Sequence, residues 1–183
     1  MLPYLLLLCV LPVARSCENI GCDLSGADLQ NVDLSNADLT NADLTNAYLT
    51  GGILIGANLQ NATLKTADIQ DAFLGNADLS GADLTNADLT NADLTNADLT
   101  NADLTNAVLI YAHLTNADLS GADLTNVDLT YANLLYADLT NANLVDANLR
   151  YTDLTNANLR DADLSGADFT NAVFSSPSLP PSS

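Results

Sequence analysis

The sequence has few basic residues, one histidine, three cysteines and no tryptophan. Only 4 lysines and arginines stand against 23 aspartates and glutamates, and the net charge of −19 excludes the basic surface that binds nucleic-acid phosphates. His113 is the only histidine, and Cys17 with Cys22 are too few for a zinc site of the usual kind. We therefore expect no enzymatic activity, no cofactor and no direct binding of nucleic acid.

The sequence contains instead one five-residue phrase, A-D-L-T-N with small variations, repeated without insertion or deletion from Cys22 to Phe174. Its 31 frames are centred on residues 24, 29, 34 and onward to 174. The centre is leucine except at Ile69, Phe169 and Phe174, and alanine stands two residues before nearly every centre. Such short self-similarity is typical of a solenoid, whose units cannot bury an apolar face alone.

The five-residue period excludes the two ordinary secondary structures. Leucines five apart advance by roughly 140° around an α-helix, so they form no apolar stripe. A continuous strand fails because the alternation of Ala27 with Leu29 loses its phase before Val32 and Leu34. The remaining interpretation is a closed tube of short extended sides with a corner every five residues. Alanine and leucine point inward, and the small polar residue after threonine occupies the corner.

The pattern resembles the pentapeptide-repeat family, whose frame A-(D/N)-L-x-x matches Ala37-Asp38-Leu39, Ala82-Asp83-Leu84 and Ala102-Asp103-Leu104. The resemblance implies an all-β fold, a right-handed quadrilateral parallel β-helix with four frames, or about 20 residues, per coil. Residues 17–174 then form about eight coils, and a strand spacing of about 4.8 Å gives a rod of roughly 37 Å. We expect the larger rings of Phe169 and Phe174 to plug the final coil.

The two ends of the chain depart from the repeat. Residues 1–16 hold a short apolar run followed by Ala14 and Ser16, which fit a signal-peptide cleavage site before Cys17. No lysine or arginine precedes this run, so an uncleaved capping segment is the alternative. Residues 175–183 are rich in proline and serine, and proline cannot continue a strand ladder, so we expect a disordered tail.

Cleavage after Ser16 would leave Cys17 and Cys22, an even pair that an exported protein can join as a disulfide over the first coil. Two free thiols are the alternative. The run that starts at Cys17 also resembles the beginning of exported cyanobacterial pentapeptide proteins, some of them in the thylakoid lumen. We expect a secreted, periplasmic or lumenal location without a membrane span after cleavage, and a cytoplasmic location if the leader is not a signal peptide.

Aspartate precedes the central residue in nineteen frames. Because residues 20 apart should stack, the sequence predicts an acidic column made of Asp38, Asp78, Asp98, Asp118 and Asp138. Carboxylates about 4.8 Å apart repel one another, so we expect raised pKa values in the folded state and a stability that increases as the pH falls from 8 to 5. Paired aspartates are also expected to bind Ca²⁺ or Mg²⁺ weakly.

The repeat and its charge allow more than one function. The plainer interpretation is a non-enzymatic structural or protein-interaction rod, with solvated aspartates and a protein partner of unknown identity. The alternative is an acidic DNA mimic that inhibits or protects a nucleic-acid-binding enzyme such as a topoisomerase, because about one charge per 2 Å approaches the density of duplex DNA. Stacked threonines make an ice-binding or water-ordering surface a remote alternative.

Aromatic and apolar residues interrupt the polar outer pattern at a few places and mark a candidate contact surface. They are Tyr111, Tyr131, Tyr136, Tyr151, Ile53 and Phe73. The 20-residue spacing of Tyr111, Tyr131 and Tyr151 predicts a ladder along one side, and the same spacing joins Ile53 to Phe73 in a small patch. The alternatives are stacking without a ligand for the ladder and ordinary apolar exposure for the patch.

Overall fold

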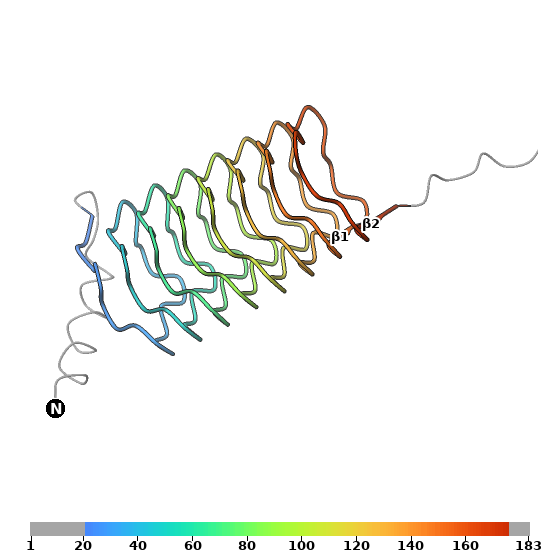
Figure 1. Cartoon of the computed structure of the whole chain (residues 1–183). Helices are drawn as coiled ribbons and strands as arrows, with labels where there is room; N and C mark the ends of the chain where they lie inside the picture. The colour runs from blue at the N-terminus through green and yellow to red at the C-terminus, as the bar shows by residue number, and fades with distance from the viewer. Residues whose placement is uncertain (1–20, 176–183) are drawn as a thin grey trace, which may run out of the picture.

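The computed structural model describes residues 21–175, which form a rod of stacked four-sided coils (Figure 1). Parallel bridges join residues 20 apart on every side of the rod, as between Asp78 and Asp98 or between Asp83 and Asp103. The predicted right-handed quadrilateral β-helix is thereby confirmed.

The predicted signal peptide, Cys17 and most of the predicted tail lie outside the described residues, and their assignments stay predictions. Cys22 lies at the N-terminal end, half-buried against the core. Ser175, the first residue of the predicted tail, is held in place, because its hydroxyl accepts the backbone N–H of Asn156 at 2.7 Å and donates to the Asn156 side chain at 2.8 Å.

Strands longer than one residue are rare in the described part of the chain. They are β1 (Asp153–Leu154) and β2 (Val173–Phe174), which pair in parallel near the C-terminal end (Figure 1). Elsewhere a single residue, the one before the central leucine, bridges to the neighbouring coils. The sheet is short along the chain because a turn follows each bridging residue almost at once, so four narrow ladders run along the rod.

Each corner is a turn whose third residue has a left-handed backbone. In the turn that follows Leu99, the N–H of Ala102 donates to the Leu99 carbonyl at 3.0 Å, and Asn101 has a φ of 57°. The same position has a positive φ in every described frame, and asparagine or glycine fills most of these positions. Asparagine and glycine tolerate this conformation best, so the predicted use of small polar residues at the corners is confirmed.

The inward-facing residues form one continuous apolar core. Every central residue from Leu39 to Leu149 is at most 1% exposed, and the alanines beside them let the sides approach closely. Thr152 is the only buried polar residue among those described. It occupies an alanine position, and its hydroxyl donates to the carbonyl of Leu129 at 2.8 Å.

The two phenylalanines do not close the C-terminal end of the described rod. Their rings lie against each other, with centroids 5.7 Å apart, and Phe174 is 49% exposed. Leu159 and Leu164 of the same coil stay partly exposed. The expectation that both rings plug the final coil holds only in part, because Phe169 packs against the core whereas Phe174 stays exposed.

The frame from Ala97 to Asn101 shows how each backbone N–H is satisfied. The N–H of Ala97 closes a turn, and that of Asp98 reaches a carbonyl of the coil below at 2.9 Å. The N–H groups of Leu99 and Asn101 reach carbonyls of the coil above at 2.7 and 3.0 Å. The fifth donor, the N–H of Thr100, is bound at 2.9 Å by Oδ1 of the Asp98 side chain.

This side-chain bond, which we call the aspartate cap, occurs in all 24 described frames with Asp or Asn before the central residue. In many frames the next hydroxyl donates to the same oxygen, as Thr90 Oγ1 does to Asp88 at 2.6 Å. Aspartate is therefore part of the backbone hydrogen-bonding scheme as well as a solvated surface residue.

Substitutions of Asp103 test the aspartate cap, since its Oδ1 accepts the N–H of Thr105 at 2.9 Å. Asp103→Ala removes the acceptor and should lower the free energy of unfolding by about 0.5–2 kcal/mol, the range of side-chain caps at helix ends. Asp103→Asn keeps the acceptor and removes a charge, so it should be neutral or slightly stabilising. Urea unfolding of both variants measures the difference, and equal losses would show that the charge, not the acceptor, is what the fold uses.

Candidate interaction surface

Each side of the rod presents one column of bridging residues that repeats every 20 residues. The four columns begin at Asp23, Asp28, Asp33 and Asp38, and they hold six, five, three and five aspartates respectively. We call the third column the Asp33 face. Its members are Asp33, Ile53, Phe73, Asp93, His113, Asn133, Asp153 and Val173. The Asp33 face is thus the least acidic side of the rod.

The N-terminal half of the Asp33 face carries the predicted apolar patch. Ile53 and Phe73 bridge to each other in adjacent coils, and Ile55 lies at the corner beside them. Phe73 and Ile55 are exposed, whereas Ile53 is half-buried. Ile53 and Phe73 stand where most frames have aspartate, so the aspartate cap is absent from these two frames.

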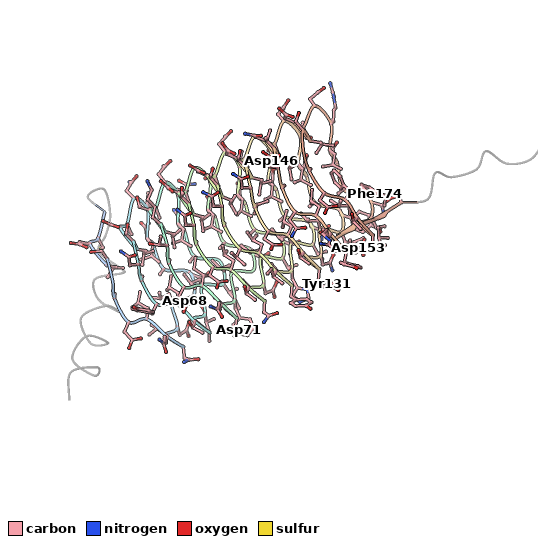
Figure 2. All side chains as sticks on the ribbon, viewed as in Figure 1. Asp68, Asp71, Tyr131, Asp146, Asp153 and Phe174 are labelled. Atoms are coloured by element: carbon pink, nitrogen blue, oxygen red, sulfur yellow. The ribbon has the colours of Figure 1, made fainter. Side chains whose placement is uncertain are left out.

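The three tyrosines of the predicted ladder lie at the corner that borders the Asp33 face. The ring centroids of Tyr111 and Tyr131 are 5.1 Å apart and those of Tyr131 and Tyr151 are 4.8 Å apart, with interplanar angles of 12° and 10°. In Figure 2, Tyr131 lies along the same edge of the rod as Asp71 of this corner. The stacking predicted from the 20-residue spacing is confirmed.

The corner position has an energetic cost for tyrosine. The four tyrosines at corners have φ values of 59–61°, and a left-handed backbone costs a bulky L-residue roughly 1–2 kcal/mol. Stacking of neighbouring rings contributes about 0.5–1.5 kcal/mol per pair and offsets part of this cost in the ladder. Tyr136 lies at the other corner of the Asp33 face, is 56% exposed and has no ring contact within the described residues. Tyrosines therefore border the Asp33 face on both sides.

Arg150 lies beside the C-terminal end of the ladder. Its guanidinium carbon is 5.9 Å from the centroid of the Tyr151 ring, and its Nε is 3.8 Å from the carboxylate of Asp168. A cation over an aromatic face is stabilised by the ring quadrupole. The last rung of the ladder thus combines an aromatic ring, an arginine and an acid.

The sequence model of the pentapeptide repeats family matches this chain in overlapping segments. These are residues 20–54, 42–81, 74–109, 107–146 and 137–175, which together span the described rod. The chain belongs to the pentapeptide repeat family. No curated protein matches this chain.

Several solved pentapeptide repeat proteins are similar to this chain. HetL of Nostoc sp. strain PCC 7120, involved in heterocyst differentiation regulation, is 35% identical over 83% of this chain and 76% of HetL, with a TM-score of 0.45. Rfr23 of Cyanothece 51142 is 43% identical over 50% of this chain and 63% of its own, with a TM-score of 0.49. A protein of the Arabidopsis thaliana thylakoid lumen is 38% identical over 52% and 63%, with a TM-score of 0.40.

The described part of this pentapeptide repeat protein brings together no group of three or more histidine, cysteine, aspartate or glutamate side chains that could hold a metal ion. His113 is exposed on the Asp33 face, where it bridges to Asp93 and Asn133. Within residues 21–175, no helix is both long and apolar enough to span a bilayer.

The predicted acidic column lies on the fourth side, where Asp78, Asp98, Asp118 and Asp138 bridge in succession and Asp38 bridges to Asn58.

Hydrogen bonds lower the pKa of many of the outward carboxyls. At Asp138 the Thr140 hydroxyl, followed by the Thr140 backbone N–H, holds the pKa below its ordinary value. Burial raises the pKa of Asp78, yet hydrogen bonds from Ser80 and Gln60 outweigh burial and the net pKa is lowered. The pKa is lowered at Asp23, Asp33, Asp38, Asp78, Asp83, Asp138, Asp163 and Asp168. The expectation of raised pKa values is wrong for these groups, because hydrogen bonds to the charged carboxylate outweigh the effect of burial.

The lowered pKa values reverse the expected pH dependence. A carboxyl with a lowered folded-state pKa stabilises the fold above its unfolded-state pKa, and this contribution is lost as the pH falls through the folded-state pKa. The thermal midpoint should therefore be nearly constant between pH 8 and 5 and should fall below about pH 4. Melting followed by circular dichroism at low salt measures this dependence. A midpoint that rises on acidification from pH 8 to 5 would instead indicate that carboxylate crowding dominates.

Proposed function

We propose that this pentapeptide repeat protein is an exported, non-enzymatic interaction rod that presents the Asp33 face and its bordering tyrosines to a protein partner. One observation carries the proposal. Of the nine exposed large hydrophobic residues in the described chain, all except Tyr48 and Phe174 lie on the Asp33 face or at its two corners. Exposed apolar and aromatic residues gathered on one side of a polar surface are typical of protein-interaction sites.

The energetic cost of these residues supports an interaction role. Ile53, Phe73 and His113 replace the aspartate that caps the backbone in other frames of this face, and the N–H groups two residues later lack that side-chain acceptor. The tyrosines occupy left-handed corners where asparagine is better tolerated. A purely structural rod gains nothing from these departures, whereas a binding surface gains rigid aromatic contact area.

The acidic DNA mimic is the second candidate, and it is favoured by the three sides of the rod that carry columns of five or six aspartates each. These columns lie on the sides other than the Asp33 face, so the two candidates use different surfaces of one rod. Export separates them, because a mature chain that starts at Cys17 outside the cytoplasm does not meet a cytosolic topoisomerase.

Affinity capture with matched tyrosine variants tests the interaction rod. The variant Tyr111→Asn, Tyr131→Asn, Tyr151→Asn installs the usual corner residue, so the fold is retained and the ladder is removed. We expect the protein captured from the host by the wild type to be reduced at least about tenfold, as loss of a hot spot near 1.4 kcal/mol or more requires. Mass spectrometry of the same material identifies the partner and the first residue of the mature chain.

A transplanted ladder is the control for composition and charge. Adding Asn86→Tyr, Asn106→Tyr and Asn126→Tyr to the triple variant builds the same ladder at a corner away from the Asp33 face. Capture should remain lost in this variant. Full recovery of capture in this variant would favour the acidic DNA mimic. Dose-dependent inhibition of topoisomerase supercoiling, whether or not the chain carries its ladder, would favour the acidic DNA mimic as well.

A further inference from the structure

We propose that the N-terminal end of the tyrosine ladder, the ring of Tyr111, binds an arginine side chain of the protein partner. This inference rests on the proposed function and deepens it by naming the chemistry of the partner. The proposed site consists of one face of the Tyr111 ring and the carboxylates near it, and the acidic columns as a whole are not part of it.

The chain itself shows which group suits the ladder. At the C-terminal rung, one face of Tyr151 packs on Tyr131, and the Arg150 guanidinium lies over the same ring while its Nε faces Asp168. The ladder therefore ends in an arginine at this side. A planar guanidinium stacks on a tyrosine ring and pairs with a carboxylate at the same time, which a neutral side chain cannot do.

The N-terminal rung lacks such a cation within the described residues. Tyr111 stacks only on Tyr131, and the residue one coil below it at this corner is the small, exposed Asn91. Arg150 directly precedes Tyr151 in the chain. The residue that directly precedes Tyr111 is Ile110, which is apolar and half-buried. Tyr111 is 50% exposed and Tyr151 is 40% exposed, so solvent reaches both end rings, but among the described residues a cation lies over the ring only at the Tyr151 end.

Carboxylates surround this accessible end on both sides. Asp88 bridges to Val108 on the neighbouring side of the rod, and Asp93 bridges to His113 on the Asp33 face. Asp71 lies at the same corner two coils below Tyr111 (Figure 2). No lysine or arginine side chain of the described residues pairs with these three aspartates. Aspartates on both neighbouring sides of the rod and at the same corner thus lie on the N-terminal side of the Tyr111 ring.

Arginine is favoured over other partner groups by charge and by shape. A rod of net charge −19 attracts a basic segment and repels an acidic one. A lysine ammonium is compact and strongly hydrated, whereas a guanidinium is planar and more weakly hydrated, so it gains more from a ring face. The occupant is therefore an arginine on an exposed segment of the partner protein.

Titration of the full chain with a small arginine peptide tests the proposal. The probe is acetyl-Gly-Arg-Gly-amide, its control is the same peptide with citrulline, and the readout is the set of assigned tyrosine ring signals in NMR spectra. We expect saturable shifts at Tyr111 with the arginine peptide, little change with citrulline, and little change at Tyr136. Asp93→Asn, which keeps the backbone cap, should weaken the binding by about twofold to fivefold, the range for an exposed ion pair.

Arg150→Thr is the second, gain-of-function arm. It installs the residue that the preceding coil carries at this position, Thr130, and it uncovers the Tyr151 ring beside Asp168. A second set of saturable shifts should then develop at Tyr151. Absence of any Tyr111 shift, equal shifts with citrulline, or equal shifts at Tyr136 would overturn the arginine site. Because the capture experiment does not depend on this peptide, failure of the arginine site is distinguishable from failure of the interaction rod.

Discussion

The hydrogen bond from an aspartate side chain to the backbone two residues later is the interaction on which the rest of this rod depends. A five-residue side with a turn at its end supplies carbonyl partners for four of its five N–H groups, as the frame from Ala97 to Asn101 shows. The fifth N–H needs an acceptor from a side chain, and aspartate or asparagine provides it in 24 frames. This repeated requirement accounts for an oxygen-bearing side chain before the central residue of most frames, and aspartate meets it in nineteen of them.

This requirement also explains how a monotonous rod acquires one distinct side. Where aspartate is kept, the surface is polar and charged, and the side chain satisfies the backbone N–H two residues later. Where it is replaced, as at Ile53, Phe73 and His113, the chain gives up the backbone cap, and these replacements gather on the Asp33 face. The tyrosines at the two bordering corners extend the same strip. Function is therefore expected where the repeat is least regular.

Much of this fold could be predicted from the period alone, because a strict five-residue repeat of alanine and leucine permits few closed arrangements. The stacking of Tyr111, Tyr131 and Tyr151 followed from the same register. The role of aspartate was missed, although its spacing to the next threonine, as in Asp98-Leu99-Thr100, is a known pattern for side-chain bonds to the backbone. The pKa direction was wrong for the same reason, since repulsion was considered without the donors. The grouping on one face required the four columns to be laid out in space.

Amide hydrogen exchange measured residue by residue tests the central role of the aspartate cap most directly. The N–H groups of Thr100, Thr105 and Thr125 are bound by aspartate Oδ1, whereas those of Thr50, Ile110 and Thr115 follow Tyr48, Val108 and His113 and have no such acceptor. The account predicts slow exchange for the first group and fast exchange for the second, although both groups lie in stacked coils of the same rod. Equal protection in the two groups would contradict it.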